Sequence, residues 1–208
     1  MKVLLINGSP HKNGCTYTAL CEVQGELEKA GIETQLVHIG DDPINGCIGC
    51  NGCAKIGRCV FNDDIVNSML SLAETSDGFV FGSPVHYAGA AGKLVCLMDR
   101  MFYAGGSKCF ENKPAACVVS ARRSGTTAAF DQLIKYFTIS NMPVVSSNYW
   151  NGVHGFTPED VRKDEEGMQT MRNLGRNMAW LLRCIEAGRK AGVPDPVREK
   201  KIATHFIR

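Results

Sequence analysis

The chain has no long run of apolar residues and no excess of charge of either sign. None of its 208 residues lie in a stretch long enough to span a membrane, and residues 1–7 are too short for the apolar part of a signal peptide. Lysine and arginine total 23 against 21 for aspartate and glutamate, which gives no reason to invoke nucleic acid or an acidic partner. We therefore expect a cytoplasmic protein that binds neither membranes nor nucleic acids.

Internal repeats and low-complexity linkers are also absent. With 44% hydrophobic residues, 208 residues suffice for one sizeable core. We expect one domain over residues 1–190, followed by a charged tail over residues 191–208. Cysteine, in contrast, is abundant: there are ten. In a cytoplasmic protein most thiols stay reduced, so a group of closely spaced cysteines suggests metal or redox chemistry before it suggests disulfides.

Apolar runs alternate with segments of helical periodicity along the chain. The runs predict strands at residues 3–6, 34–39, 78–81, 115–119 and 142–145. The periodicity predicts helices at residues 16–31, 65–72, 93–102, 130–137 and 158–185. Five strands separated by crossover helices predict an α/β fold with a parallel, doubly wound sheet.

The turn at residues 8–16 follows the first strand and opens the first helix. Such a turn aims backbone N–H groups and the positive end of the helix dipole at one point, which favours an anion. Ser9 and Thr16 can add hydroxyl donors, and His11 and Lys12 can add a cation. The turn has neither the P-loop pattern nor the dinucleotide glycine pattern, so it suits a single phosphate. A glycine- and serine-rich turn without a ligand is the alternative.

Two more polar turns are expected after the third and fourth strands, at residues 82–92 and 120–127. In an open α/β sheet, ligands bind beyond the carboxyl ends of the strands, near the point where the strand order reverses. We therefore expect all three turns to meet at one edge of the sheet.

These turns carry a resemblance to a known family. Residues 9–16, 83–87 and the pair Asp99-Arg100 resemble the NAD(P)H-dependent FMN reductases of the flavodoxin-like superfamily. The spacing of Cys47, Cys50, Cys53 and Cys59 is similar to that of the iron–sulfur flavoprotein branch. The resemblance covers residues 1 to about 187. It implies a five-stranded sheet in the order 2-1-3-4-5 within three α/β/α layers, bound FMN, and assembly into homodimers or homotetramers.

The resemblance also implies which residues hold the FMN. One group would surround the phosphate: Ser9, His11, Lys12, Asn13, Cys15 and Thr16. His11 stands where the family often has arginine, which gives the phosphate a less permanently charged partner. A second group would line the flavin ring: Pro84, Val85, His86, Tyr87, Ser120, Arg122 and Gly125. No catalytic side chain is expected, because N5 of the flavin carries the chemistry.

The cysteine segment, residues 46–60, places a glycine before three of its thiols, a pattern that favours a loop lying close to a ligand. Four thiolates so close in sequence suit a [4Fe–4S] cluster, with Cys47, Cys50, Cys53 and Cys59 as ligands. Zinc is a second candidate, although its structural sites usually pair two C-x2-C units across a longer gap. Reduced, unmetallated thiols at a subunit contact are the third.

Three functions follow from these residues. The first is an FMN-dependent oxidoreductase that takes hydride from NAD(P)H and reduces a quinone, a nitro or azo compound, a flavin or another acceptor. The second is an iron–sulfur flavoprotein that carries electrons between ferredoxin-like partner proteins. The third is a regulator whose cysteines sense oxidation.

Overall fold

A single central β-sheet runs through the protein, which we describe from a computed structural model covering residues 1–200 and 202–205. Of the tail predicted at residues 191–208, residues 201 and 206–208 lie outside the described residues. The strands lie in the order β2-β1-β3-β5-β6, all parallel, and β4 pairs antiparallel with β3. Their bounds are β1 Lys2–Asn7, β2 Glu33–His38, β3 Gly78–His86, β4 Gly89–Ala90, β5 Ala115–Ala121 and β6 Gly152–His154.

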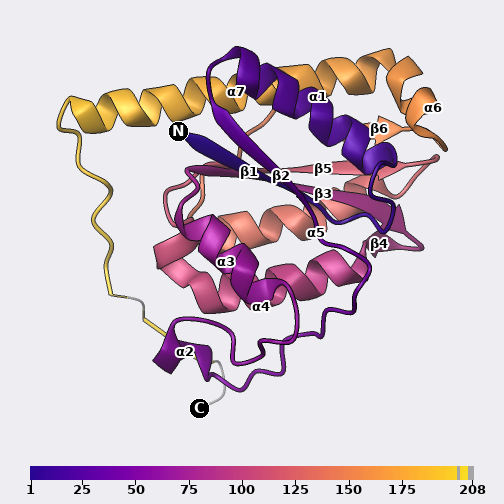
Figure 1. The fold of residues 1–208 in the computed structure, drawn as a ribbon. Helices are drawn as coiled ribbons and strands as arrows, with labels where there is room; N and C mark the ends of the chain where they lie inside the picture. Colours follow the sequence, from indigo (N-terminus) through magenta and orange to yellow (C-terminus); the bar gives the residue numbers. More distant parts are fainter. Residues whose placement is uncertain (201, 206–208) are drawn as a thin grey trace.

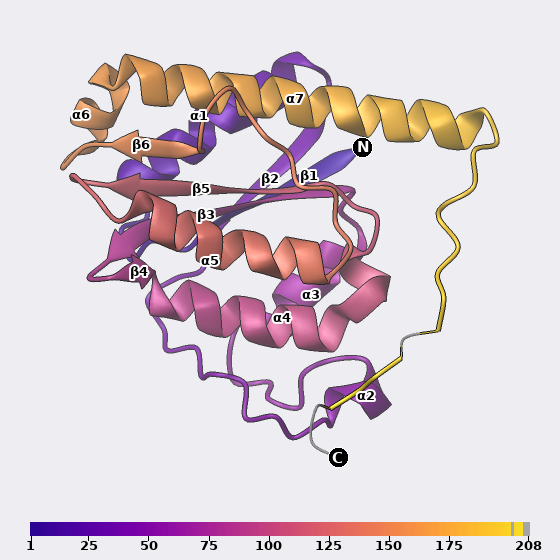
Figure 2. The same cartoon turned by 180° about the vertical axis from the view of Figure 1, so that it is seen from behind.

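Helices cover both faces of the sheet, as Figures 1 and 2 show. On one face lie α1 (Cys15–Lys29), α6 (Pro158–Lys163) and α7 (Glu165–Lys190). On the other lie α3 (Val66–Glu74), α4 (Gly92–Phe110) and α5 (Thr126–Ile139), with the one-turn helix α2 (Cys53–Ile56) outside α4. The three-layer, doubly wound class predicted from the sequence is confirmed.

The central strands are buried on both faces because their side chains alternate between two cores. Phe79 and Phe81 of β3 pack among α3, α4 and α5, whereas Val80 packs among α1 and α7. Residues 3–6 of β1 are fully buried. Continuous apolar runs are typical of such parallel strands, which is why the sequence located them well.

The strand prediction was wrong at residues 142–145. Only an isolated bridge joins Val144 to Ala115, and the edge of the sheet is formed by β6. Pro143 has no N–H group to donate, and the N–H of Met142 closes the end of α5 on Phe137 O at 3.0 Å. β6 takes the place of the strand expected at residues 142–145, and the two-residue strand β4 is added beside β3. The sheet therefore has six strands rather than five, and the strand order differs in detail from the prediction.

Other boundaries also differ from the predictions. β3 continues to His86, so residues 82–86 form strand where a turn was expected. The single helix expected from Pro158 is two, α6 and α7, divided at Asp164. The Asp164 carboxylate caps α7 through Gly167 N at 3.0 Å and accepts from His154 N at 2.7 Å, so the chain turns there to meet β6. Among the described residues, no helix is both long and apolar enough to cross a membrane.

Candidate functional site

The turn after β1 is held open by a buried asparagine. Asn7 is fully buried; its Nδ2 donates to Lys12 O at 3.0 Å, and its Oδ1 accepts from Ser9 N at 3.1 Å. The Ser9 hydroxyl accepts from His11 N at 3.1 Å, so it is engaged within the turn. The side chains of His11, Lys12 and Asn13 are exposed around it. The turn therefore has a fixed backbone and is not filled by its own side chains.

Helix α1 starts inside this turn with its first N–H groups available. Gly14 is the N-cap and makes no side-chain cap hydrogen bond, so the first-turn amides have no partner from the cap. The Cys15 thiol lies 3.6 Å from Gly155 O, and burial raises the pKa of Cys15, so it stays a neutral thiol. Free amides at a helix start suit a phosphate or another anion.

The end of β3 carries an unusual backbone conformation. Tyr87 has φ of 56°, and Ala88 N donates to His86 O at 2.7 Å across it. A bulky residue is rarely found at positive φ, which costs on the order of 1–3 kcal/mol. Tyr87 and Ala88 form the two-residue turn between β3 and β4, in which His86 pairs with Gly89. Two-residue hairpin turns have a positive φ at their first residue, so the turn accounts for this conformation. The Tyr87 ring is fully exposed.

The segments predicted as turns, residues 8–16, 82–92 and 120–127, are in direct contact at the carboxyl ends of β1, β3 and β5. Thr16 Oγ1 and Ser120 Oγ, both buried, lie 2.8 Å apart. A Cβ at Gly125, which has φ of 92°, would lie 2.9 Å from Val85 Cγ1. The predicted meeting of three turns at one sheet edge is therefore confirmed.

Glycines allow the backbone to come this close. Gly8 N donates to Gly82 O at 2.8 Å. A Cβ at Gly82 would lie 2.7 Å from Leu20 Cδ1 and 2.8 Å from Thr16 Cγ2. Pro84 and Val85 are half-buried beside these contacts, whereas His86 and Arg122 are exposed at the rim.

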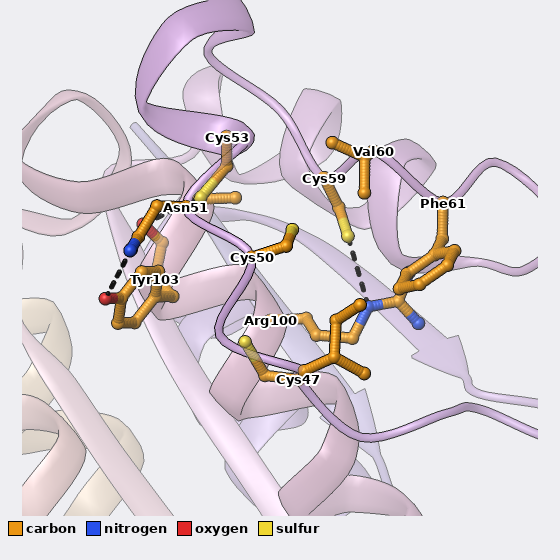
Figure 3. Close-up of a pocket in the computed structure, with 11 residues that line it drawn as sticks. Cys47, Cys50, Asn51, Cys53, Cys59, Val60, Phe61, Arg100 and Tyr103 are labelled. Carbon is orange, nitrogen blue, oxygen red and sulfur yellow. Dashed lines mark hydrogen bonds between the residues drawn. The ribbon is translucent and has the colours of Figure 1, made fainter.

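The four cysteines of the segment 46–60 line one pocket (Figure 3). In the close-up, Cys50 and Cys59 point toward each other across it. Cys47 and Cys50 are exposed, Cys53 is half-buried and Cys59 is buried. Within residues 1–200 and 202–205, no three histidine, cysteine or acidic side chains are grouped closely enough for one metal ion. Four thiols lining one pocket fit a [4Fe–4S] cluster in the number and chemistry of its ligands.

Helix α4 fixes the path of the cysteine segment. Lys93 Nζ donates to Gly40 O and to Asp42 O at 3.2 Å. Two turns of helix later, Arg100 Nη1 donates to Asn45 O at 3.2 Å. Tyr103 OH then donates to Asn51 Oδ1 at 2.9 Å, as Figure 3 shows. Successive residues of α4 thus bind the chain from Gly40 to Asn51, which leads into the cysteine segment and lies along the helix in Figure 2.

Arg100 lies at the inner wall of the pocket and is 2% exposed. Its Nη1 and Nη2 both donate to the Asp64 carboxylate, Nη2 to Oδ1 at 3.2 Å, and its Nε lies 3.3 Å from Cys59 Sγ. Burial acts to lower the pKa of Arg100, but the hydrogen bonds to Asp64 and Cys59 outweigh it and raise that pKa. Arg100 therefore stays charged against the pocket.

Sequence reasoning missed several residues of this pocket. Arg100 entered only through the resemblance, and Asp64 directly precedes the helix predicted at residues 65–72, where an aspartate is typical of an N-cap. Asp64 does accept from Val66 N at 3.1 Å, but its carboxylate also pairs with Arg100. Phe61 and Tyr103 carried no sequence signal. The Arg100 guanidinium lies 5.3 Å from the centre of the Phe61 ring. An arginine beside the apolar stripe of residues 94–101 was the one available clue.

Three turns at the carboxyl edge of a doubly wound parallel sheet define a flavodoxin-like protein. The chain belongs to the NADPH-dependent FMN reductase family, whose profile matches residues 1–157, and within it to the iron–sulfur flavoproteins. An iron–sulfur flavoprotein of Methanocaldococcus jannaschii is 34% identical over 193 residues, which cover 89% of this chain and 100% of that protein. The resemblance seen in the sequence is confirmed.

Solved structures share the fold. The NAD(P)H:quinone oxidoreductase of Methanothermobacter marburgensis has a TM-score of 0.65 at 18% identity, covering 86% of this chain and 96% of that one. A flavodoxin from the domain Archaea has a TM-score of 0.61 at 14% identity, covering 88% and 99%. At these identities the likeness extends to the fold alone.

Proposed function

We propose that the protein is an FMN-dependent oxidoreductase that takes hydride from NAD(P)H and passes electrons to a quinone, a nitro or azo compound, a flavin or another acceptor. The observation that carries this proposal is the contact among the three turns, through Thr16 with Ser120 and Val85 with Gly125. One flavin mononucleotide has a phosphate and a ring system that such an edge can hold at the same time. The family description supports the cofactor.

The turn after β1 would hold the phosphate. The amides at the start of α1, around Cys15 and Thr16, supply donors, and the exposed side chains of Ser9's neighbours His11, Lys12 and Asn13 supply charge and further hydrogen bonds. Thr16 and Ser120 share one hydrogen bond, so the pair retains one hydroxyl hydrogen for a ligand. Phosphate binding here would depend mainly on backbone groups.

The other two turns would hold the flavin ring. Pro84, Val85 and the exposed residues His86 and Tyr87 form one side, and Ser120, Arg122 and Gly125 form the other. Arg122 would place a cation near the polar edge of the ring, where it stabilises negative charge. When bound, the flavin supplies the redox chemistry by accepting hydride at N5 and releasing electrons to an acceptor. The protein would supply position, charge and access.

A second candidate function is that of an iron–sulfur flavoprotein carrying electrons between ferredoxin-like partners. The meeting of Cys47, Cys50, Cys53 and Cys59 on one pocket favours it, as does the name of the similar archaeal protein. A [4Fe–4S] cluster held there would supply one-electron transfer. Assembly into a homodimer or homotetramer belongs to the same proposal.

Anaerobic purification tests both functions. We expect a yellow protein with about one FMN per chain that NAD(P)H bleaches, because the site is built for one flavin. Iron and sulfide analysis of the same sample tests the cluster, and Cys50→Ser should remove it. A colourless protein that takes up no FMN would refute the oxidoreductase. Reduction of the flavin by reduced ferredoxin and not by NAD(P)H would favour the electron carrier.

A further inference from the structure

Arg100 is a charged side chain buried in the wall of the cysteine pocket. It is 2% exposed, and the buried residues Leu97 and Met101 lie beside it on α4. A buried charge is costly unless it is paired and hydrogen-bonded. The Asp64 carboxylate, 4% exposed, supplies the pairing through both terminal nitrogens of the guanidinium. This bidentate geometry leaves the Nε–H group to point elsewhere.

The Nε–H group points at a predicted cluster ligand. Nε lies 3.3 Å from Cys59 Sγ, the contact drawn as a dashed line in Figure 3. A neutral thiol is a weak acceptor, whereas a thiolate accepts a charge-assisted hydrogen bond. Cys59 is also the most buried of the four cysteines, so its thiolate is the one that water stabilises least.

We propose that Arg100 is a positioning residue for the iron–sulfur site, which holds Cys59 Sγ as a ligand and raises the reduction potential of the cluster. This inference rests on the proposed cluster. Reduction adds negative charge, and a nearby cation or N–H donor stabilises the reduced form more than the oxidised form. Hydrogen bonds to the sulfurs and local charge are among the factors that set cluster potentials.

Arg100 also has contacts that would serve a purely structural role. Its Nη1 holds Asn45 O at 3.2 Å, and its guanidinium lies 5.3 Å from the centre of the Phe61 ring. Loss of these contacts would loosen the cysteine segment without a change in the potential of any cluster that remains. The potential therefore separates the two roles.

The test is the midpoint potential of the cluster, measured by EPR-monitored titration of anaerobically purified full-length variants. Arg100→Lys keeps the charge and removes the Nε–H donor. The double variant Arg100→Gln with Asp64→Asn removes both charges and leaves two amides that can bond each other. We expect both variants to lower the midpoint potential by about 59 mV. For a one-electron couple, this is a tenfold shift of the reduced-to-oxidised ratio toward the oxidised form at a fixed potential. Arg58→Gln removes an exposed charge of the same segment and serves as control, with a much smaller shift.

Each other outcome is also decisive. Unchanged potentials in variants that load the cluster would refute the role of Arg100 while leaving the cluster in place. Wild-type protein without iron and sulfide would refute the cluster and the inference with it. If Arg100→Lys assembles no cluster, thermal unfolding of its apo-protein decides: a wild-type midpoint supports the positioning role, and a lowered midpoint overturns it in favour of a structural one.

Discussion

Thr16 Oγ1 on α1 lies 2.8 Å from Ser120 Oγ at the end of β5, and both side chains are buried. These residues are 104 positions apart in the chain, and their hydrogen bond joins the first turn of the proposed flavin site to the third. Removing this hydrogen bond therefore tests how much it contributes to holding the two segments together.

Thr16→Val should lower the free energy of unfolding by about 1–3 kcal/mol, because it leaves the buried Ser120 hydroxyl without its partner. Adding Ser120→Ala should recover part of this loss. Urea unfolding of the apo-proteins measures both effects, and Thr138→Val on the exposed side of α5 is the control. Strictly additive losses in the double variant would show that the two hydroxyls do not interact.

Gly125→Ala should weaken FMN binding, because the new Cβ would lie 2.9 Å from Val85 Cγ1 and the residue has φ of 92°. We expect a destabilisation on the order of 1–3 kcal/mol together with a loss of flavin affinity by titration. Gly25→Ala on α1 is the matched control: nothing lies within 4 Å of its Cβ, and it should stabilise the helix by about 1 kcal/mol. Equal flavin affinity in the two variants would contradict the placement of the ring between the second and third turns.

Glu26 should make stability depend on pH. Hydrogen bonds from Lys29 and Arg176, each at 2.7 Å, lower its pKa, and the second joins α1 to α7. A lowered pKa in the folded state gives stability that is present above the ordinary glutamate pKa of about 4.3 and is lost as the pH falls through the folded value. The stability difference between wild type and Glu26→Gln should therefore be present at neutral pH and shrink in acid.

Urea unfolding at several pH values measures this difference. Glu186→Gln, which makes the same charge change at a more exposed pair on α7, is the control. A difference for Glu26→Gln that stays constant from neutral to acid pH would show that ionisation of Glu26 does not contribute.

Thiol alkylation should report the state of the cysteine pocket. Cys47, Cys50 and Cys184 are exposed, whereas Cys117 is buried and burial raises its pKa. At mildly alkaline pH, mass spectrometry of the apo-protein should show rapid modification of the three exposed thiols and none of Cys117. Loading with iron and sulfide should protect Cys47 and Cys50 and leave Cys184 reactive. Equal protection of Cys184 would point to a general loss of access.

The strands and turns that depend on local sequence pattern were predictable. Residues 3–6 and 115–119 are apolar on both faces, so their strands were predictable, and the turn at 8–16 was identified by its small and hydroxyl residues. β6 was not predictable, because its three residues are too few to show an alternation, while residues 142–145 look more strand-like. The division at Asp164 depends on its carboxylate, which accepts from His154 N and Gly167 N, and a Cβ at position 167 would clash with that carboxylate.

The cysteine pocket was predictable in part. The spacing of the four cysteines indicated a shared ligand, and they do line one pocket. The wall of the pocket was not predictable, because Arg100 contacts Asp64 and Cys59 from 36 and 41 positions away. Whether the four thiols hold a cluster stays a prediction, as do the roles of the residues proposed to bind FMN.

Helix α4 begins beside the proposed flavin site and carries Arg100 about 12 Å further along its axis. An inserted or deleted residue within this stretch would rotate everything beyond it by about 100°. Arg100 and Tyr103 would then leave the cysteine segment even if every loop kept its length. Variation in the length of α4 between Gly92 and Arg100 is therefore incompatible with this arrangement.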